Sequence, residues 1–454
     1  MRRESVGIGL LLASMLISGC VGAVHLQVEP ESFESTSEAA IDNPRTATFE
    51  VVRNQSGGAP GKIVAMTNQR ADGNRVVAGQ GRLPESAPQD IVLAGRPAWL
   101  TAAPLTDGSV WVAVLDDGRV QAFRLIGQIA TSIPIQPAHL PVGAPPLLVV
   151  EADQPRLLTA PADASPLAPP ELLSDGRMAY ISKDGDLVLW DGAELARFTV
   201  AALPDARILI DEADRLLLLT DPTDRYDHGI LGDAIEASRV TLIETTPTPR
   251  IAATMVIPAP QVIENIAPLW ADLNGDGERE IIVTVSDNAQ GAQVRVFTEE
   301  GSDMAAGPAI GRGHRWRHQL AVTSFGPNGE MELVEVLTPH IGGVAQFYQL
   351  VDGALNVVAG ISGYTSHQIG SRNLDMAVAG DFDGDGAVEL LLANDAFRSL
   401  GAIRRTAEGA EIAWTLPMGG AKIATNLAVV AVGDRIIAVG VGREDGILRI
   451  WSEN

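Results

Sequence analysis

Residues 381–389 read DFDGDGAVE and are followed at once by the apolar run Leu390–Ala393. A sibling, DLNGDGERE, occupies residues 272–280, and a degraded copy, SFGPNGEME, occupies residues 324–332. Each copy precedes an apolar run, and the three begin at residues 272, 324 and 381, so they are spaced by 52 and 57 residues. A repeat of about 50–60 residues with about four strands is typical of one blade of a β-propeller.

The rest of the chain predicts an all-β protein. Short apolar runs such as Val110–Leu115 alternate with Asp-Gly hairpin turns, and helical periodicity is absent. At about 55 residues each, residues 46–454 make roughly seven four-stranded blades. The C-terminal residues 436–451 supply only a strand pair. We therefore expect an N-terminal strand, Thr46–Val52, to complete the last blade and close the ring.

The spacing of oxygen-bearing residues in two of the copies predicts calcium sites. Positions 1, 3 and 5 carry an acid or an amide, position 6 is Gly and position 9 is Glu. Alternate side chains of a tight loop point inward, position 7 offers its carbonyl, and this set of hard oxygens selects calcium over zinc or copper. A helix–loop–helix calcium hand would need Glu at position 12, where the chain has Val283 and Leu392. The alternative is that both copies are Asp/Gly-rich turns held by their own hydrogen bonds.

These copies resemble the FG-GAP/VCBS repeat family, whose calcium-loop blades also build the integrin α head. The match is specific at 272–280 and 381–389 and partial at 324–332, and the family's Phe-Gly and Gly-Ala-Pro signature is not clearly present. The resemblance implies a bacterial β-propeller with about two structural calcium ions. The copy at 324–332 lacks acids at positions 1, 3 and 5, so we expect it to be empty. The implied ligands are Asp272, Asn274, Asp276, Glu278 and Glu280 in one loop, and Asp381, Asp383, Asp385, Ala387 and Glu389 in the other.

The first 20 residues are typical of a bacterial lipoprotein signal. Two arginines precede an apolar stretch of about a dozen residues, which is too short to span a bilayer. The stretch ends Ile17-Ser18-Gly19-Cys20, which resembles a lipobox, and Cys20 is the only cysteine of the chain. We expect lipidation of Cys20, a flexible tether over residues 21–45, and a propeller held at the outer face of the cytoplasmic membrane or at the outer membrane. The alternative is a soluble secreted protein whose signal happens to end near a cysteine.

The charge balance argues against some classes of binding partner. The chain carries 57 Asp and Glu against 33 Lys and Arg, a formal net charge of −24. Such an acidic surface repels nucleic acid and anionic lipid headgroups, so we expect no nucleic-acid partner and membrane contact through the lipid anchor only. Aromatic residues make up 4% of the chain, which does not favour a large sugar-binding cleft. The expected partner is an envelope protein or glycan.

Five of the seven histidines fall in segments that propeller connectivity places on the face opposite the calcium loops. We interpret this face as a candidate site for an anionic ligand or a partner loop. The alternative is that these are solvated loop residues, since polar loops are the rule. The residues concerned are His228, His314, His318, His340, His367 and Arg372.

These features favour a non-catalytic, calcium-binding binding or scaffold module at the cell envelope. The alternative is a calcium-dependent propeller enzyme, a lyase or hydrolase, that acts on a polysaccharide through the His/Arg-rich face. A third hypothesis is an assembly scaffold similar to the propeller lipoproteins of outer-membrane protein insertion, although those lack calcium loops. The nucleophile-elbow, zinc-protease and dinucleotide-binding motifs do not occur in the chain.

Overall fold

The computed structural model describes residues 62–67 and 69–453. This part of the chain contains 34 β-strands, one short 3-10 helix, η1 (Leu83–Glu85), and no α-helix. The prediction of an all-β protein is therefore confirmed. No helix among these residues is long and apolar enough to cross a membrane.

The strands form six hydrogen-bonded sheets, and each of the two largest sheets divides into two antiparallel units, so the described residues form eight units. Three units are β1 (Lys62–Ala65), β8 (Leu148–Glu151) and β9 (Gln154–Leu157); β4 (Pro97–Leu105), β5 (Gly108–Leu115), β6 (Val120–Ile126) and β7 (Ile129–Ile133); and β10 (Glu171–Leu172), β11 (Met178–Ile181), β12 (Asp186–Trp190) and β13 (Glu194–Thr199). The next three are β14 (Leu209–Ile210), β15 (Leu216–Thr223), β16 (Glu236–Glu244) and β17 (Arg250–Val256); β18 (Val262–Ile263), β19 (Leu269–Ala271), β20 (Glu280–Ser286), β21 (Gln293–Phe297) and β22 (Asp303–Ala306); and β23 (Arg317–Thr323), β24 (Glu332–Leu337), β25 (Val344–Val351) and β26 (Ala354–Ser362). The last two are β27 (Tyr364–Thr365), β28 (Ala377–Asp381), β29 (Glu389–Asn394), β30 (Ser399–Thr406) and β31 (Gly409–Pro417); and β32 (Ile423–Val432), β33 (Arg435–Arg443), β34 (Ile447–Ser452) and β3 (Pro88–Val92), with β2 (Val76–Gln80) between these two units.

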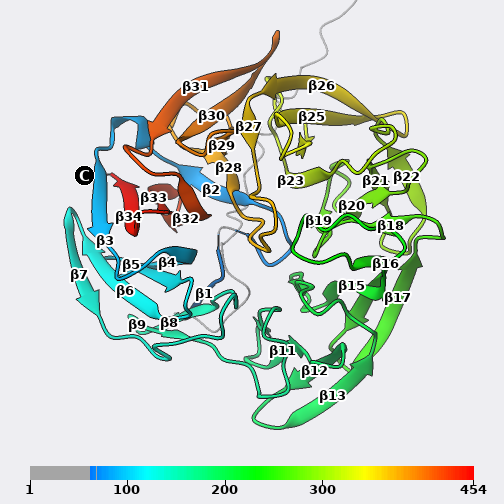
Figure 1. Cartoon of the computed structure of the whole chain (residues 1–454), viewed down its shortest axis with the longest axis horizontal. Helices are drawn as coiled ribbons and strands as arrows, with labels where there is room; N and C mark the ends of the chain where they lie inside the picture. The colour runs from blue at the N-terminus through cyan, green and yellow to red at the C-terminus, as the bar shows by residue number, and fades with distance from the viewer. Residues whose placement is uncertain (1–61, 68, 454) are drawn as a thin grey trace, which may run out of the picture. The chain divides into compact units, whose positions relative to one another are not determined.

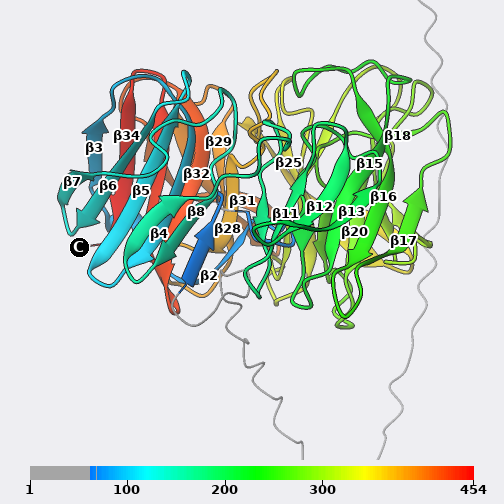
Figure 2. The ribbon, with the colours of Figure 1, turned by 90° about the horizontal axis from the view of Figure 1, so that it is seen from below.

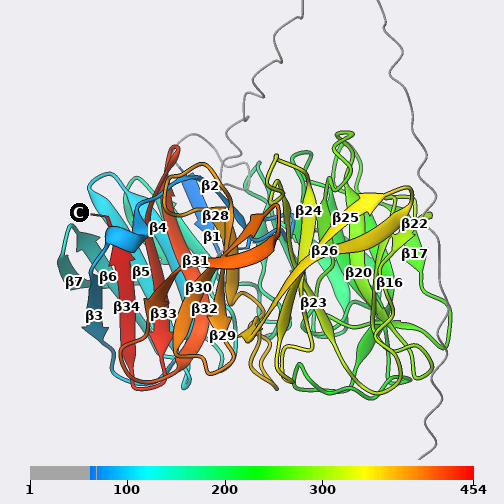
Figure 3. The ribbon, with the colours of Figure 1, turned by 90° about the horizontal axis from the view of Figure 1, so that it is seen from above.

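The eight units follow one another around a central axis like the blades of a β-propeller (Figure 1). Their strands run roughly along that axis, as the two side views show (Figure 2 and Figure 3). The count is one more than the seven blades expected from the spacing of the acidic copies. Other blades are shorter than that spacing, because the four strands β4–β7 occupy only residues 97–133.

An N-terminal strand completes the C-terminal blade, as expected, but it is β3. This strand pairs antiparallel with β34 from Pro88 opposite Trp451 to Val92 opposite Ile447. The strand predicted for this role, Thr46–Val52, lies outside the described residues.

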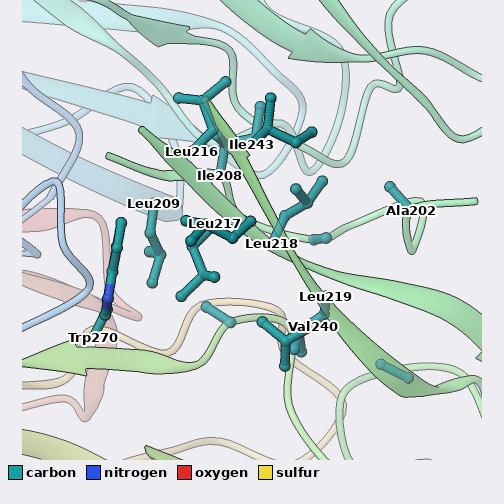
Figure 4. Packing of buried hydrophobic residues seen from close by; sticks show 14 of the residues in the cluster. Ala202, Ile208, Leu209, Leu216, Leu217, Leu218, Leu219, Val240, Ile243 and Trp270 are labelled. Atoms are coloured by element: carbon teal, nitrogen blue, oxygen red, sulfur yellow. The ribbon is translucent and has the colours of Figure 1, made fainter. Parts of the chain in front are cut away.

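Neighbouring blades pack through aliphatic cores. In β15 the four consecutive residues Leu216–Leu219 are all fully buried, because both faces of the strand are covered by adjacent blades (Figure 4). A strand buried on both faces reads as a continuous apolar run rather than an alternating one. Burying each leucine side chain contributes about 1.5–3 kcal/mol, which holds adjacent blades together.

Residues 69–75 cross the axis and join the inner strands of several blades. Backbone bonds run from Ile210 N–H to Ala71 C=O (2.8 Å) and from Ala379 N–H to Arg75 C=O (2.8 Å). The Arg75 guanidinium also binds the fully buried Asp375 carboxylate at 2.9 Å. The N-terminal segment therefore links inner strands of different blades.

Candidate functional site

The three acidic copies occupy the same position in three blades. Residues 272–280 join β19 to β20, residues 324–332 join β23 to β24, and residues 381–389 join β28 to β29. Each copy therefore joins two strands that pair antiparallel within its blade: β19 with β20, β23 with β24, and β28 with β29.

The loop at 381–389 is wound around its own acidic side chains. The carboxylate of Asp381 accepts the N–H groups of Gly384 (2.7 Å) and Gly386 (3.0 Å). Asp385 accepts the N–H of Ala387 at 2.9 Å in the same manner. One oxygen of each of Asp381, Asp383 and Asp385 lies within 4.8 Å of the other two, a spacing that a single cation can bridge.

Glu389 closes this loop with one oxygen and leaves the other unpaired. Its Oε2 accepts the Phe382 N–H at 2.9 Å, while its Oε1 is buried without a hydrogen-bond partner. Burial raises the pKa of Glu389 to about 8 against the lowering by the Phe382 hydrogen bond, and the neighbouring charges of Asp383, Asp385 and Asp381 raise it further. A buried oxygen of this kind is costly unless a donor or cation satisfies it. The donor set therefore fits a hard cation such as calcium.

The loop at 272–280 has the same hydrogen bonds from its glycines to the first aspartate, but its inward-facing side chains are paired differently. Asp272 accepts the N–H groups of Gly275 (2.7 Å) and Gly277 (3.0 Å). The amide nitrogen of Asn274 donates to Asp276 Oδ2 (2.9 Å) and to Glu280 Oε1 (3.0 Å). It therefore satisfies the glutamate oxygen that is unpaired in the other loop, where Asp385 Oδ2 is bound by Arg404 instead.

This loop also brings its acids together. Oxygens of Asp272, Asp276 and Glu280 lie within 4.8 Å of one another. Burial raises the pKa of Glu280, and the charges of Asp272 and Asp276 act in the same direction. Glu278, expected to offer its carbonyl, donates its N–H to Asp276 Oδ1 at 2.8 Å.

The degraded copy balances its buried acid with an arginine. Glu332 stands at position 9, equivalent to Glu280 and Glu389, and is fully buried. The Arg405 guanidinium, from β30 of the next blade, binds both of its oxygens at 2.9 and 3.2 Å. The expectation that this copy is empty of calcium thus has a physical basis, although it remains a prediction.

Three of the five histidines of the predicted face, His318, His340 and His367, gather around Trp316. The Trp316 ring stacks on His318 with centroids 4.6 Å apart and meets His367 edge-on at 5.2 Å. His340 Nε2 and His367 Nδ1 are 2.7 Å apart, so one donates a hydrogen bond to the other. His228 and His314 form a second group, in which they stack at 5.2 Å and both meet the Tyr226 ring edge-on. His340 follows Leu337 at one end of β24 and Glu332 of the acidic copy lies at the other, which matches the predicted separation of the two faces.

The three histidines around Trp316 have the electrostatics of a largely uncharged aromatic group. Burial lowers the pKa of His340 to about 4 and the pKa of His367 to about 3, and lowers the pKa of the fully buried His318 well below its ordinary value. Arg372 is bound by Asp205 and Asp233, each at 2.7 Å. The positive charge of Arg372 is therefore already balanced, and an anionic ligand would have to compete with these two carboxylates.

Comparison with known proteins adds a likeness of fold. No family model matches the chain, and no curated protein matches it. Among solved structures, the chain is similar to BamB from Moraxella catarrhalis, with a TM-score of 0.46 and 14% sequence identity over 81% of this chain and 98% of that one. The FG-GAP/VCBS resemblance therefore remains a prediction drawn from the loop motifs.

Sequence reasoning missed three features. Glu264 binds His228 Nδ1 at 2.6 Å from a distant part of the chain, and no local pattern marks it. Trp316 stood between two recognised histidines, yet its central position depends on three different segments meeting. The ion pairs of Asp375 with Arg75 and Arg207 at the axis also escaped notice, because they are 300 and 168 residues apart in sequence.

Proposed function

We propose that this protein is a calcium-binding β-propeller of the cell envelope that acts as a non-catalytic binding or scaffold module. The observation that carries the calcium part is the unpaired, buried Oε1 of Glu389 beside three convergent aspartates. A calcium ion would satisfy this oxygen and neutralise the loop, using Asp381, Asp383, Asp385, the Ala387 carbonyl and Glu389 as ligands. The second site uses Asp272, Asn274, Asp276, the Glu278 carbonyl and Glu280.

Both ions would be structural. Each loop joins two core strands of a blade, so an ion there fixes the hairpin that those strands form. The two loops sit away from the histidine cluster, at the other end of the blades, so partner binding and calcium binding use different surfaces.

The anchor belongs to the same proposal. Lipidation of Cys20, followed by a tether over residues 21–45, would hold an acidic propeller at the membrane without inserting it. Metabolic labelling with a radioactive fatty acid tests this part: the wild-type chain should take up label and Cys20→Ser should not. Equal labelling of both chains would refute the anchor.

Calorimetric titration of the calcium-free propeller with calcium tests the metal part. We expect two bound ions per chain, one after Glu389→Gln and one after Glu280→Gln. Gln keeps the shape of each side chain and removes its charge. Absence of binding heat in the wild-type chain, with magnesium as the parallel control, would refute the calcium proposal.

The partner we propose is an envelope protein or a glycan. Capture from native membranes with and without a chelator tests this, because a structural role for calcium predicts that the chelator weakens capture. Capture that needs neither calcium nor the folded propeller would contradict it.

One observation favours an enzymatic alternative. His228 Nδ1 lies 2.6 Å from Glu264, whose other oxygen accepts a hydrogen bond from Ser286. A buried carboxylate that orients an imidazole is an arrangement used for general acid–base catalysis. Turnover of an envelope polysaccharide by the lipid-free propeller, lost in His228→Gln, would support this alternative over the scaffold.

A further inference from the structure

The segment from Val76 to Leu83 runs directly beside the acidic loop at 381–389. Its strand β2 pairs in parallel with β28, with Val76 opposite Ala379 and Gln80 opposite Asp381. Both side views show β2 lying along β28 (Figure 2 and Figure 3). On its other edge Gln80 pairs with Arg435 of β33, so the segment is held between two blades.

The first two residues of the loop hold this segment through their backbone. The Gly81 N–H donates to the Asp381 carbonyl at 2.8 Å, and the Leu83 N–H donates to the Phe382 carbonyl at 3.0 Å. The side chains of Leu83 and Phe382 are both fully buried in one core. The segment is thus attached to the loop by two hydrogen bonds and a shared apolar contact.

The same two loop residues also form part of the proposed metal site. Asp381 supplies a carboxylate to it, and the Phe382 N–H binds the Glu389 carboxylate at 2.9 Å. The carbonyls that hold the segment therefore belong to residues whose other groups would be fixed by the ion.

The two backbones pack so closely that only glycine fits at Gly81 and Gly384. A Cβ added to Gly81 would lie 2.8 Å from the Phe382 carbonyl oxygen, and one added to Gly384 would lie 2.8 Å from the Gly81 carbonyl oxygen. The close packing and the two backbone hydrogen bonds join the segment to the loop.

The segment connects the axis of the propeller to its last blade. It continues through η1 into β3, the strand that completes the last blade by pairing with β34. Its other end continues from the residues that cross the axis, where Arg75 binds Asp375. Weakening the hydrogen bonds to Gly81 and Leu83 would therefore affect the segment that connects the axis to the outer edge of the last blade.

We infer that calcium in the loop at 381–389 acts as a clasp that fastens the N-terminal segment 76–92 to its two blades. Without the ion, four carboxyl groups face one another in this loop, and its hold on Gly81 and Leu83 loosens. The inference rests on the proposed function, because it requires calcium in this loop. The loop at 272–280 is the internal contrast: its link to the N-terminal segment is a side-chain bond from Arg279 to Asp72 at 3.0 Å rather than a pair of backbone bonds from its first two residues.

Hydrogen exchange of the intact propeller, with calcium chloride or after chelation, measures the clasp at the amides concerned. In the wild-type chain, calcium should slow exchange at Gly81 and Leu83 by about tenfold or more, as expected when a local opening is suppressed. Glu280→Gln should keep this effect and Glu389→Gln should lose it. Asp383→Asn provides a second variant in the same loop if Glu389→Gln fails to fold: it weakens calcium binding there, so the slowing of exchange at Gly81 and Leu83 should require about tenfold more calcium than in the wild-type chain.

The outcomes separate the clasp from the calcium proposal. Two ions bound by calorimetry with unchanged exchange at Gly81 and Leu83 would overturn the clasp and leave the calcium proposal intact. Equal slowing in Glu389→Gln and in the wild-type chain would overturn the clasp as well. A chain that binds no calcium would overturn both.

Discussion

The loops at 381–389 and 324–332 show two ways to place a buried glutamate at the same point of a blade. Glu389 and Glu332 are both fully buried at the start of a second strand. Glu332 is paired with Arg405, whereas Glu389 keeps one oxygen unpaired and has three aspartates around it. A buried carboxylate needs a compensating charge, and in one blade this is a side chain while in the other we propose a metal ion. The loop with the proposed metal ion has acids at positions 1, 3 and 5, and the loop with the arginine has none there.

Removing calcium should have the largest effect. An ion that binds only the folded state at 100 times its Kd adds about 2.7 kcal/mol, so two sites add about 5 kcal/mol to the free energy of unfolding. Thermal unfolding of the wild-type chain with calcium and after chelation measures this. The double variant Glu280→Gln/Glu389→Gln is the control and should unfold at the same temperature in both conditions. A chelator-induced shift of equal size in the control would contradict the assignment of the sites.

Removing Arg405 should have the second-largest effect on the free energy of unfolding. In Arg405→Met the Glu332 carboxylate stays buried without its partner, which should cost about 3–5 kcal/mol in denaturant unfolding. Adding Glu332→Gln should recover much of that loss, because the uncompensated charge disappears. Arg435→Met is the matched control, since the Arg435 side chain is 65% exposed in its pair with Glu453 and should cost about 1 kcal/mol or less. A loss in Arg405→Met no larger than that of the control would break the comparison.

Changing the amide of Asn274 to a carboxylate should make the two loops more alike in their affinity for calcium. Asn274→Asp gives the loop at 272–280 the acidic pattern of the loop at 381–389, and should tighten calcium binding there by about tenfold, because affinity rises with ligand charge. The reciprocal Asp383→Asn should weaken the other site by a similar factor. Calorimetry of both variants measures the two affinities, and changes in the same direction would be inconsistent with these roles.

Removing a nearby cation should have the smallest effect. The Arg404 guanidinium pairs with Asp385 at the rim of the loop, where both side chains are partly exposed. Arg404→Gln should tighten calcium binding by roughly twofold, which corresponds to a surface ion pair of about 0.5 kcal/mol. Arg295→Gln, which removes an equally peripheral pair with Asp303 in another blade, should leave this affinity unchanged. Weaker binding in Arg404→Gln would show that the arginine supports the site instead of competing with the ion.

Local features of the fold were predictable from the sequence, because they depend on neighbouring residues. The acidic copies precede the apolar runs that become β20, β24 and β29. Their internal hydrogen bonds follow from Asp and Gly at fixed spacing.

What escaped prediction depends on segments that meet only in the folded chain. Arg405 reaches Glu332 across 73 residues, and nothing near Glu332 indicates it. An N-terminal strand was expected in the last blade, but the sequence did not indicate that β3 takes this place. The axis-crossing segment was missed because its partners lie far away in the chain. The blade count was one too low, because the spacing of three related blades was applied to shorter ones. The histidines were found by connectivity, but their pKa values depend on a burial that the sequence does not show.

The most direct test is a crystal of the propeller grown with calcium, with data collected at a wavelength where calcium scatters anomalously. The account predicts one anomalous peak among Asp381, Asp383, Asp385 and Glu389, a second among Asp272, Asp276 and Glu280, and none beside Glu332. A loop at 381–389 without a peak, or a peak beside Glu332 in place of the Arg405 contact, would contradict it.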